Sequence, residues 1–200
     1  FIGAEGTLGI ITAATLKLYP LPQGKCAAFA AVAGPSEALA LLHLAQSRVG
    51  FELTSFELLP RICIDFCLRH LDGAFDPLSA SHPWYVIAEI SSGESAAAAK
   101  ADMEAILAEA RDATVIRDSV IPSADEAAGI WRMRYSISDV QRPEGVSIKH
   151  DISVPVSRIA EFLETATPMV QKMAPDALVI AFGHLGDGNL HFNMAGRDAE

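Results

Sequence analysis

From residue 26 onward, the sequence alternates between short apolar segments typical of strands and longer segments with helical periodicity. The pattern predicts strands at 26–32, 51–58, 84–90 and 114–117, and helices at 36–48, 59–71 and 95–111. Each kind of element has an apolar face that must be covered by the other kind. The alternation therefore requires a sheet with helices packed on it, which limits the fold class to α+β or α/β.

Composition excludes several classes of protein. The chain has 200 residues and a formal net charge of −10, from 15 Lys and Arg against 25 Asp and Glu. This length suits one large domain, or one domain and a fragment of another. An acidic excess is repelled by phosphate groups, which argues against nucleic-acid binding and against adhesion to anionic membranes. No apolar run in the sequence approaches the roughly 20 residues that span a bilayer.

The three cysteines do not form a disulfide framework. Cys63 and Cys67 are four residues apart in a helical pattern, and Cys26 lies in a predicted strand. An odd number of thiols at apolar positions indicates reduced core residues rather than a metal site or a redox pair. A reducing compartment is consistent with this usage.

Residues 1–24 differ in pattern from the rest of the chain. The sequence begins at Phe1 without an initiator Met, and a Gly-rich stretch leads into a short β-rich segment. Pro20, Pro22 and Gly24 then interrupt the pattern, as linker residues do. We expect a piece of a longer protein, in which one unit ends near residue 24 and a second unit occupies residues 25–200.

A helix is predicted to begin after Ser123, which has Glu126 at the spacing of a capping box. The 3.6-residue period places Arg134 on the inward, apolar face of this helix, with Ser138 one turn further along. A buried guanidinium needs an anion. Two interpretations remain equally open: an internal ion pair, or a grip on the carboxylate of a ligand.

Residues 146–154 alternate as a strand does. Val146, Ile148, Ile152 and Val154 are expected on an apolar face, with His150 among them as a core residue. Lys149 and Asp151 fall on the opposite, polar face. That face is either solvated or, if it turns toward Arg134, supplies a second cation to an anion-binding pocket.

Residues 179–194 predict a β-hairpin, because Asp187-Gly188 is a strong signal for a two-residue turn. In that register His184 and His191 pair directly, with Cβ atoms roughly 5 Å apart. Two imidazoles at this separation can bind one divalent metal ion. Asn193 shares their face, and Asp151 is a possible third ligand from within the chain.

These segments together resemble the carboxyl-terminal part of the FAD-linked oxidases that act on D-2-hydroxy acids. Members include D-lactate and D-2-hydroxyglutarate dehydrogenases and the flavin subunit of glycolate oxidase. The stretch 183–191, Gly-His-Leu-Gly-Asp-Gly-Asn-Leu-His, is similar to the metal-binding signature of the family, and residues 3–12 are similar to the segment that ends its FAD-binding domain. Residues 131–134 and 149–155 also resemble family blocks.

The resemblance implies an α+β domain of ferredoxin-like type, with an antiparallel or mixed sheet and helices on one face, preceded by a remnant of the FAD-binding domain at 1–24. The implied site residues are Gly3, Glu5, Gly6, Gly9 and Ile11 for FAD, Arg134, Ser138, Lys149 and Asn193 for substrate, and His184 and His191 for a divalent metal, with zinc as the expected ion. The catalytic base is expected beyond residue 200. Two positions depart from the family pattern: Ala4 replaces a Ser, and Ser138 stands where the D-2-hydroxyglutarate enzymes have Thr.

The implied activity is oxidation of a D-2-hydroxy acid to the 2-oxo acid by a homo-oligomeric enzyme of the cytoplasm, or of the mitochondrion in a eukaryote. Its electron acceptor would be an electron-transfer flavoprotein, a quinone or a cytochrome. One alternative is a non-catalytic α+β module that binds a metal or an anion. Another is a flavin oxidase that acts on a phenol or an alcohol.

Overall fold

A computed structural model describes residues 1, 4, 6–18 and 20–196. Its first half is a βαββαβ unit with strand order β4-β1-β3-β2 and antiparallel pairing. The elements of this unit are β1 (Gly24–Val32), α1 (Pro35–Val49), β2 (Leu53–Pro60), β3 (Trp84–Ser92), α3 (Ala96–Asp112) and β4 (Asp118–Val120). This topology confirms the α+β class and the ferredoxin-like arrangement.

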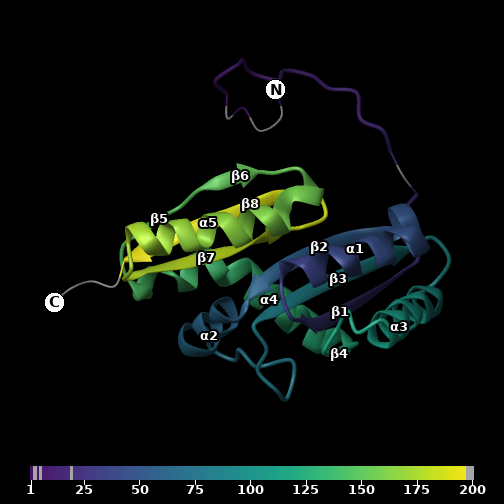
Figure 1. Ribbon diagram of the computed structural model, residues 1–200. Coiled ribbons are helices and arrows are strands. Elements are labelled where there is room, and N and C mark those ends of the chain that lie inside the picture. Colours follow the sequence, from purple (N-terminus) through teal and green to yellow (C-terminus); the bar gives the residue numbers. More distant parts are fainter. Residues whose placement is uncertain (2–3, 5, 19, 197–200) are drawn as a thin grey trace.

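The second half of the chain extends the same sheet (Figure 1). The described part of the sheet has eight strands, in the order β4-β1-β3-β2-β7-β8-β5, and β6 also pairs with β8. The further elements are α2 (Arg61–His70), α4 (Ala124–Val140), β5 (Ser147–Ile148), β6 (Asp151–Ser153), α5 (Ile159–Met173), β7 (Ala177–His184) and β8 (Asn189–Gly196), with short 3-10 helices at Gly50–Glu52, Arg142–Glu144 and Val156–Arg158. None of the helices in the described part of the chain is long and apolar enough to cross a membrane.

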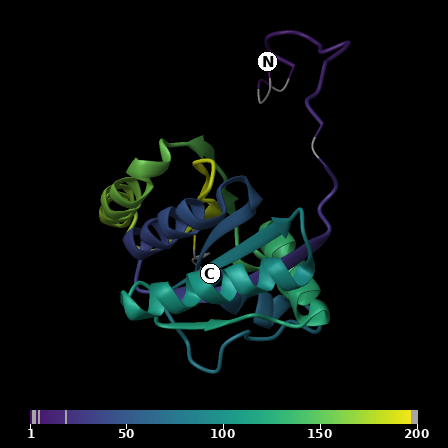
Figure 2. The same cartoon turned by 90° about the vertical axis from the view of Figure 1, so that its right-hand side faces the viewer.

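Helices cover both faces of the sheet, whereas helices on one face were expected. Helices α1, α3 and α5 pack on one face, and α2 and α4 pack on the other (Figure 2). The reason lies in the central strand β3, which is apolar on both sides. Its Val86 and Ala88 contact the first helix layer, while Tyr85 and Ile87 contact the second.

The strand predicted at 114–117 is wrong, and β4 begins at Asp118 instead. The backbone N–H groups of Val115 and Ile116 both donate to the carbonyl of Ala110, and Thr114 has a φ of 58°. These bonds close the carboxyl end of α3, so residues 114–116 are used in the helix-terminating turn.

The strand predicted at 146–154 forms only as two short pieces, β5 and β6. Between them, the backbone N–H of His150 donates to the side chain of Asn193 instead of to a neighbouring strand. The predicted apolar face is covered only in part. Ile152 and Val154 pack against the core as predicted, whereas Val146 and Ile148 are 77% and 61% exposed and His150 is exposed. Alternation in a short edge segment does not decide which face is covered.

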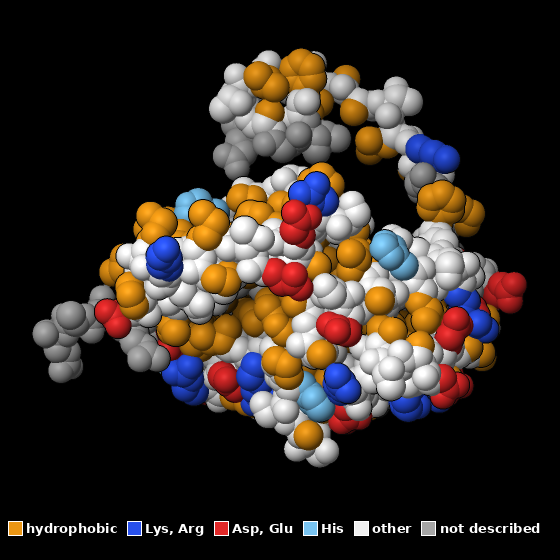
Figure 3. Space-filling view, viewed as in Figure 1, with side chains coloured by type: hydrophobic (Ala, Val, Ile, Leu, Met, Phe, Trp, Pro, Cys, Tyr) orange, Lys and Arg blue, Asp and Glu red, His pale blue; other side chains and the backbone are white. Residues whose placement is uncertain are grey.

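The amino-terminal segment runs away from the sheet as an extended arm (Figures 1 and 3). Its large apolar side chains are mostly in solvent; Leu8, Ile10, Ile11, Leu16, Leu18 and Leu21 are each at least half exposed. Such a row of exposed apolar residues is typical of a surface that another part of a protein covers.

Cys63 and Cys67 are free, buried thiols in α2, as predicted. Burial raises the pKa of Cys67 to about 11 and raises that of Cys63 well above its ordinary value. Iodoacetamide at pH 8 is therefore expected to leave peptide 62–69 unmodified in the folded full-length protein and to modify it fully in urea, as measured by mass spectrometry. Rapid labelling of the folded protein would contradict the burial.

The same shifts carry a pH dependence. The folded state keeps thiol protons that the unfolded chain releases above its ordinary pKa of 9.0. The contribution of Cys67 to stability is therefore complete below pH 9 and is lost as the pH rises toward 11.

Candidate functional site

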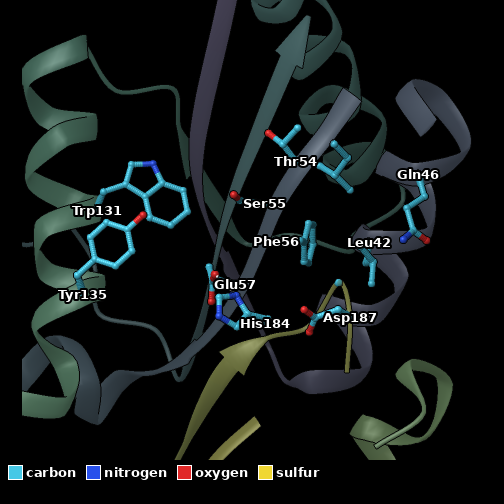
Figure 4. A pocket seen from close by; sticks show the side chains of 12 residues that line it. Leu42, Gln46, Thr54, Ser55, Phe56, Glu57, Trp131, Tyr135, His184 and Asp187 are labelled. Carbon is cyan, nitrogen blue, oxygen red and sulfur yellow. Dashed lines mark ion pairs between the residues drawn. The ribbon is translucent and has the colours of Figure 1, made fainter. Parts of the chain in front are cut away.

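The candidate site lies where β2 and β7 separate. β2 pairs with β3 along its length, but with β7 only through Glu57–His184 and Leu58–Gly183. Beyond these pairs, the free edge of β2 borders a cleft of about 370 Å³ (Figure 4). The cleft is lined by residues of α1, β2, α4, the end of β7 and the loop after it: Leu42, Gln46, Leu53, Thr54, Ser55, Phe56, Glu57, Trp131, Tyr135, His184, Gly186 and Asp187.

Helix α4 forms one wall of the cleft and begins as predicted. The Ser123 hydroxyl accepts from the backbone N–H of Glu126, and the Glu126 carboxylate accepts from the backbone N–H of Ser123. Hydrogen bonds from Ser123 lower the pKa of Glu126, with the side-chain hydroxyl as the larger cause and the backbone N–H as the smaller one. The rings of Trp131 and Tyr135, one helical turn apart, stack with centroids 5.7 Å apart on the cleft wall (Figure 4).

Arg134 lies on the buried face of α4, as the helical period predicts, and is 7% exposed. Its Nε and Nη2 contact Oε2 of Glu57 at 2.9 and 2.8 Å. Its Cζ lies over the ring of Phe182, 5.2 Å from the centroid. The internal ion pair, one of the two interpretations left open by the sequence, is therefore present, and Glu57 lies between Arg134 and the cleft.

The β7–β8 hairpin forms, but its predicted register is wrong. His184 pairs with Asn189 and His191 pairs with Phe182, so residues 185–188 make a four-residue loop. Contacts outside a two-residue turn favour this loop: the Gly186 N–H donates to Phe56 O, and the Val154 N–H donates to the carbonyl of Gly188, whose φ is +84°.

His184 and His191 nevertheless share one face of the sheet. The register differs from the predicted one by two residues, and side chains alternate with a period of two. The two histidines become diagonal neighbours, for which Cβ atoms are about 7 Å apart rather than 5 Å. The ring of His191 packs on Phe182, with centroids 4.7 Å apart.

Each of these two imidazoles is held by a carboxylate through Nδ1. Nδ1 of His184 is 2.6 Å from Glu57 Oε1, and Nδ1 of His191 contacts Asp151. Asp151, expected as a possible third metal ligand, therefore contacts a histidine instead. Within residues 1, 4, 6–18 and 20–196, no three His, Cys, Asp or Glu side chains form a metal-binding group. A carboxylate on Nδ1 is the usual support of a histidine that binds metal through Nε2, so the donor set fits two of the ligands of such an ion.

Ser138 and Lys149 are brought together, since Nζ of Lys149 donates to the backbone carbonyl of Ser138 at 3.0 Å. Both side chains are exposed, so the prediction that Ser138 shares the inward face of the helix with Arg134 is wrong. Ser138 is one turn beyond Arg134 on α4, so the second cation lies next to the helix that carries the first.

Asn193 is 2% exposed and does not line the cleft. Its Nδ2 donates to Oε1 of Gln141 at 3.1 Å, and its Oδ1 accepts from the backbone N–H of His150 at 3.2 Å. The side chain connects β8 to the end of α4 and to the segment between β5 and β6.

Of the residues expected to contact FAD, Gly3 and Glu5 lie outside the described residues. Gly6 and Gly9 have φ values of 79° and 141°, and Ile11 is 57% exposed. All three belong to the extended arm.

Sequence reasoning missed Glu57. A signal was present, because Glu57 is a charged residue between the apolar residues Phe56 and Leu58 in the strand predicted at 51–58. A carboxylate in that position is buried and must be paired.

Comparison with known proteins identifies relatives along the whole chain. It is 32% identical over 196 residues to a mitochondrial D-2-hydroxyglutarate dehydrogenase of Arabidopsis thaliana, covering 98% of this chain and 34% of the relative. It is 35% identical to a D-2-hydroxyglutarate dehydrogenase of Xanthomonas citri pv. viticola, covering 99% of this chain and 41% of the relative. The chain thus spans 34% and 41% of the length of these two relatives.

Two solved structures have the same fold. One is an alkyldihydroxyacetonephosphate synthase, with a TM-score of 0.60, 17% identity and coverage of 98% of this chain and 41% of that one. The other is p-cresol methylhydroxylase, with a TM-score of 0.62, 9% identity and coverage of 90% and 40%. At these identities the likeness concerns the fold alone.

The family assignment follows from a match over most of the chain. Residues 21–199 match the family described as FAD linked oxidases, C-terminal domain. This span includes every strand and helix given above. The chain therefore belongs to the FAD-linked oxidases, as part of their C-terminal domain.

Proposed function

We propose that this chain is part of an FAD-dependent dehydrogenase that oxidises a D-2-hydroxy acid, of the D-lactate, D-2-hydroxyglutarate or glycolate type, to the 2-oxo acid. The observation that carries the proposal is the junction of β2 and β7, where Glu57 joins a guanidinium and an imidazole at the mouth of a cleft. The names of the relatives support the same substrate class.

The carboxylate of the substrate is assigned to Arg134, Ser138 and Lys149. A guanidinium can bind a carboxylate through two parallel hydrogen bonds, and an ammonium adds a second charge. Asn193 is assigned to substrate binding because it holds the segment that carries Lys149. Its side-chain amide forms hydrogen bonds with Gln141 and with the backbone N–H of His150, next to Lys149. These groups would fix the orientation of the acid, which is a large part of catalysis.

His184 and His191 are proposed to hold a divalent metal ion, with zinc as the expected ion. A metal ion held by His184 and His191 would supply a Lewis acid for the C2 hydroxyl, and a bound flavin would supply the acceptor for the C2 hydride. The carboxylates on both Nδ1 atoms support this role, because they leave the Nε2 atoms as ligands. A base that removes the hydroxyl proton, and a third ligand, are assigned to residues beyond 200.

Residues 1–24 are proposed to end the FAD-binding domain, and residues 25–200 to belong to the substrate and metal domain. The exposed apolar side chains of the arm support a covering domain. We assign FAD contacts to Gly3, Glu5, Gly6, Gly9 and Ile11. The proposal includes a homo-oligomer in the cytoplasm or mitochondrion and an electron-transfer flavoprotein, quinone or cytochrome as acceptor.

The alternatives differ in what they require of the site. A phenol or alcohol oxidase needs no carboxylate-binding cations, whereas here Lys149 contacts the backbone of Ser138, one turn beyond Arg134 on α4. A module without catalysis explains the histidines, but gives no function to an FAD-linked oxidase domain.

A substrate screen of the full-length protein tests the proposal. With an artificial electron acceptor, we expect dye reduction with D-2-hydroxy acids and none with their L-enantiomers, p-cresol or simple alcohols. Turnover of phenols alone would favour the alternative oxidase, and a protein without flavin would favour the non-catalytic module.

A further inference from the structure

We propose that Glu57 is a positioning residue that orients His184 for metal binding and Arg134 for carboxylate binding. The inference rests on the proposed function, since it concerns the same site. In this assignment Glu57 contacts neither the substrate nor the metal ion. It acts through His184 and Arg134, the two side chains that it contacts.

Burial makes Glu57 suited to this task. It is 3% exposed, in the middle of β2, and its backbone is fixed by pairing to β3 on one side and to His184 on the other. Its two carboxylate oxygens are divided between two partners: Oε1 contacts His184, and Oε2 contacts Arg134. A carboxylate with both oxygens engaged in a buried place has one orientation.

The contact to Oε1 determines which nitrogen of His184 can bind a metal. In the neutral imidazole, the Nδ1–H donates a hydrogen bond to the carboxylate, and Nε2 then carries the free lone pair. Since His184 is half exposed, its ring would otherwise rotate in the cleft. Glu57 thus selects both the tautomer and the ring orientation.

The contacts to Oε2 determine how Arg134 presents its guanidinium. Nε and Nη2 are held by Glu57, while the plane lies over Phe182. Among the described residues, the side-chain hydrogen bonds and ion pairs of Arg134 are those of Nε and Nη2 to Glu57. The guanidinium is therefore fixed at one edge and retains donors for a ligand.

Asp151 supplies the matched control, because it contacts His191 as Glu57 contacts His184. The Asp151 side chain is 68% exposed, whereas that of Glu57 is 4% exposed. A contact of an exposed carboxylate is weak, since water competes for both partners. The two carboxylates should therefore differ greatly in their effect on metal binding.

The test uses the full-length flavoprotein and makes two measurements. Competition with a chelator gives the Zn²⁺ affinity, and the visible spectrum of the Co²⁺-substituted protein is recorded at wavelengths longer than those of the flavin bands. Glu57→Gln is expected to weaken Zn²⁺ binding by about 10- to 100-fold and to change the Co²⁺ spectrum. Asp151→Asn is expected to weaken binding by at most about fivefold.

A second variant distinguishes a specific loss of metal binding from misfolding of the protein. Glu57→Met with Arg134→Met removes both buried charges together, a change that folded proteins tolerate. The double variant leaves Nδ1 of His184 without an acceptor, so a 10- to 100-fold loss of Zn²⁺ affinity is expected here as well.

The outcomes separate this inference from the proposed function. Wild-type Zn²⁺ affinity and an unchanged Co²⁺ spectrum in both Glu57 variants would overturn the inference and leave the metal site intact. A wild-type protein that binds neither ion would overturn both the metal site and the inference.

Discussion

Arg134→Met is expected to lower the free energy of unfolding by about 3–5 kcal/mol, the usual cost of leaving one member of a buried ion pair alone. The residue left behind would be Glu57, 3% exposed and without its cation. Urea unfolding of the full-length protein, with hydrogen exchange in peptides from β2 and α4 as the local probe, measures the change. Exchange in both peptides should accelerate, because they are joined by this pair.

Two further variants identify the cause. Arg142→Met removes an arginine whose partner, Asp139, is 70% exposed, and is expected to cost less than about 1 kcal/mol. Glu57→Met with Arg134→Met should recover most of the lost stability, because no unpaired charge remains. If Arg134→Met were as stable as Arg142→Met, the Glu57 carboxylate would not depend on Arg134.

The elements of the fold were predictable where their signals are local. The strands around Phe29 and Ile87 and the helices over Leu41 and Met103 follow from apolar runs and helical periodicity, and lie within a few residues of the predicted ranges. The start of α4 follows from the capping box. Errors arise where distant segments decide the outcome, as in the turn after α3, whose residues bond back to Ala110.

The site was predictable in part for the same reason. The helical period places Arg134 inward without any knowledge of its partner. The partner, Glu57, is 77 positions away in sequence and becomes adjacent only when α4 packs on the sheet. A period of 3.6 describes a face of a helix, but not which strand lies beneath that face.

The hairpin shows which part of a register depends on local signals. Asp187-Gly188 favours a two-residue turn, but a bond from Gly186 to β2 and a bond from Val154 to Gly188 select a longer loop. The error of two residues preserves the alternation, so His184 and His191 still share a face. The prediction that the two histidines share a face of the sheet is therefore correct although the predicted turn is wrong, whereas the prediction that they pair directly is wrong.

His184→Ala and His191→Ala are each expected to remove the bound divalent ion from the full-length protein and to lower kcat/KM for a D-2-hydroxy acid by about 10²- to 10⁴-fold. A metal contributes several kcal/mol to charge stabilisation in the transition state, and about 1.4 kcal/mol corresponds to each factor of ten. Elemental analysis gives the metal content, and dye reduction with saturating acceptor gives the rate.

His43→Ala is the matched control for these two variants, since His43 is exposed on α1 and does not line the cleft. It should retain metal, flavin and activity. The flavin spectrum separates loss of metal from general misfolding, because the assigned FAD contacts lie in the amino-terminal arm rather than in the hairpin. Unchanged metal content or unchanged kcat/KM in both histidine variants would exclude the metal role. The His184–Glu57 and His191–Asp151 contacts would then serve only to stabilise the sheet.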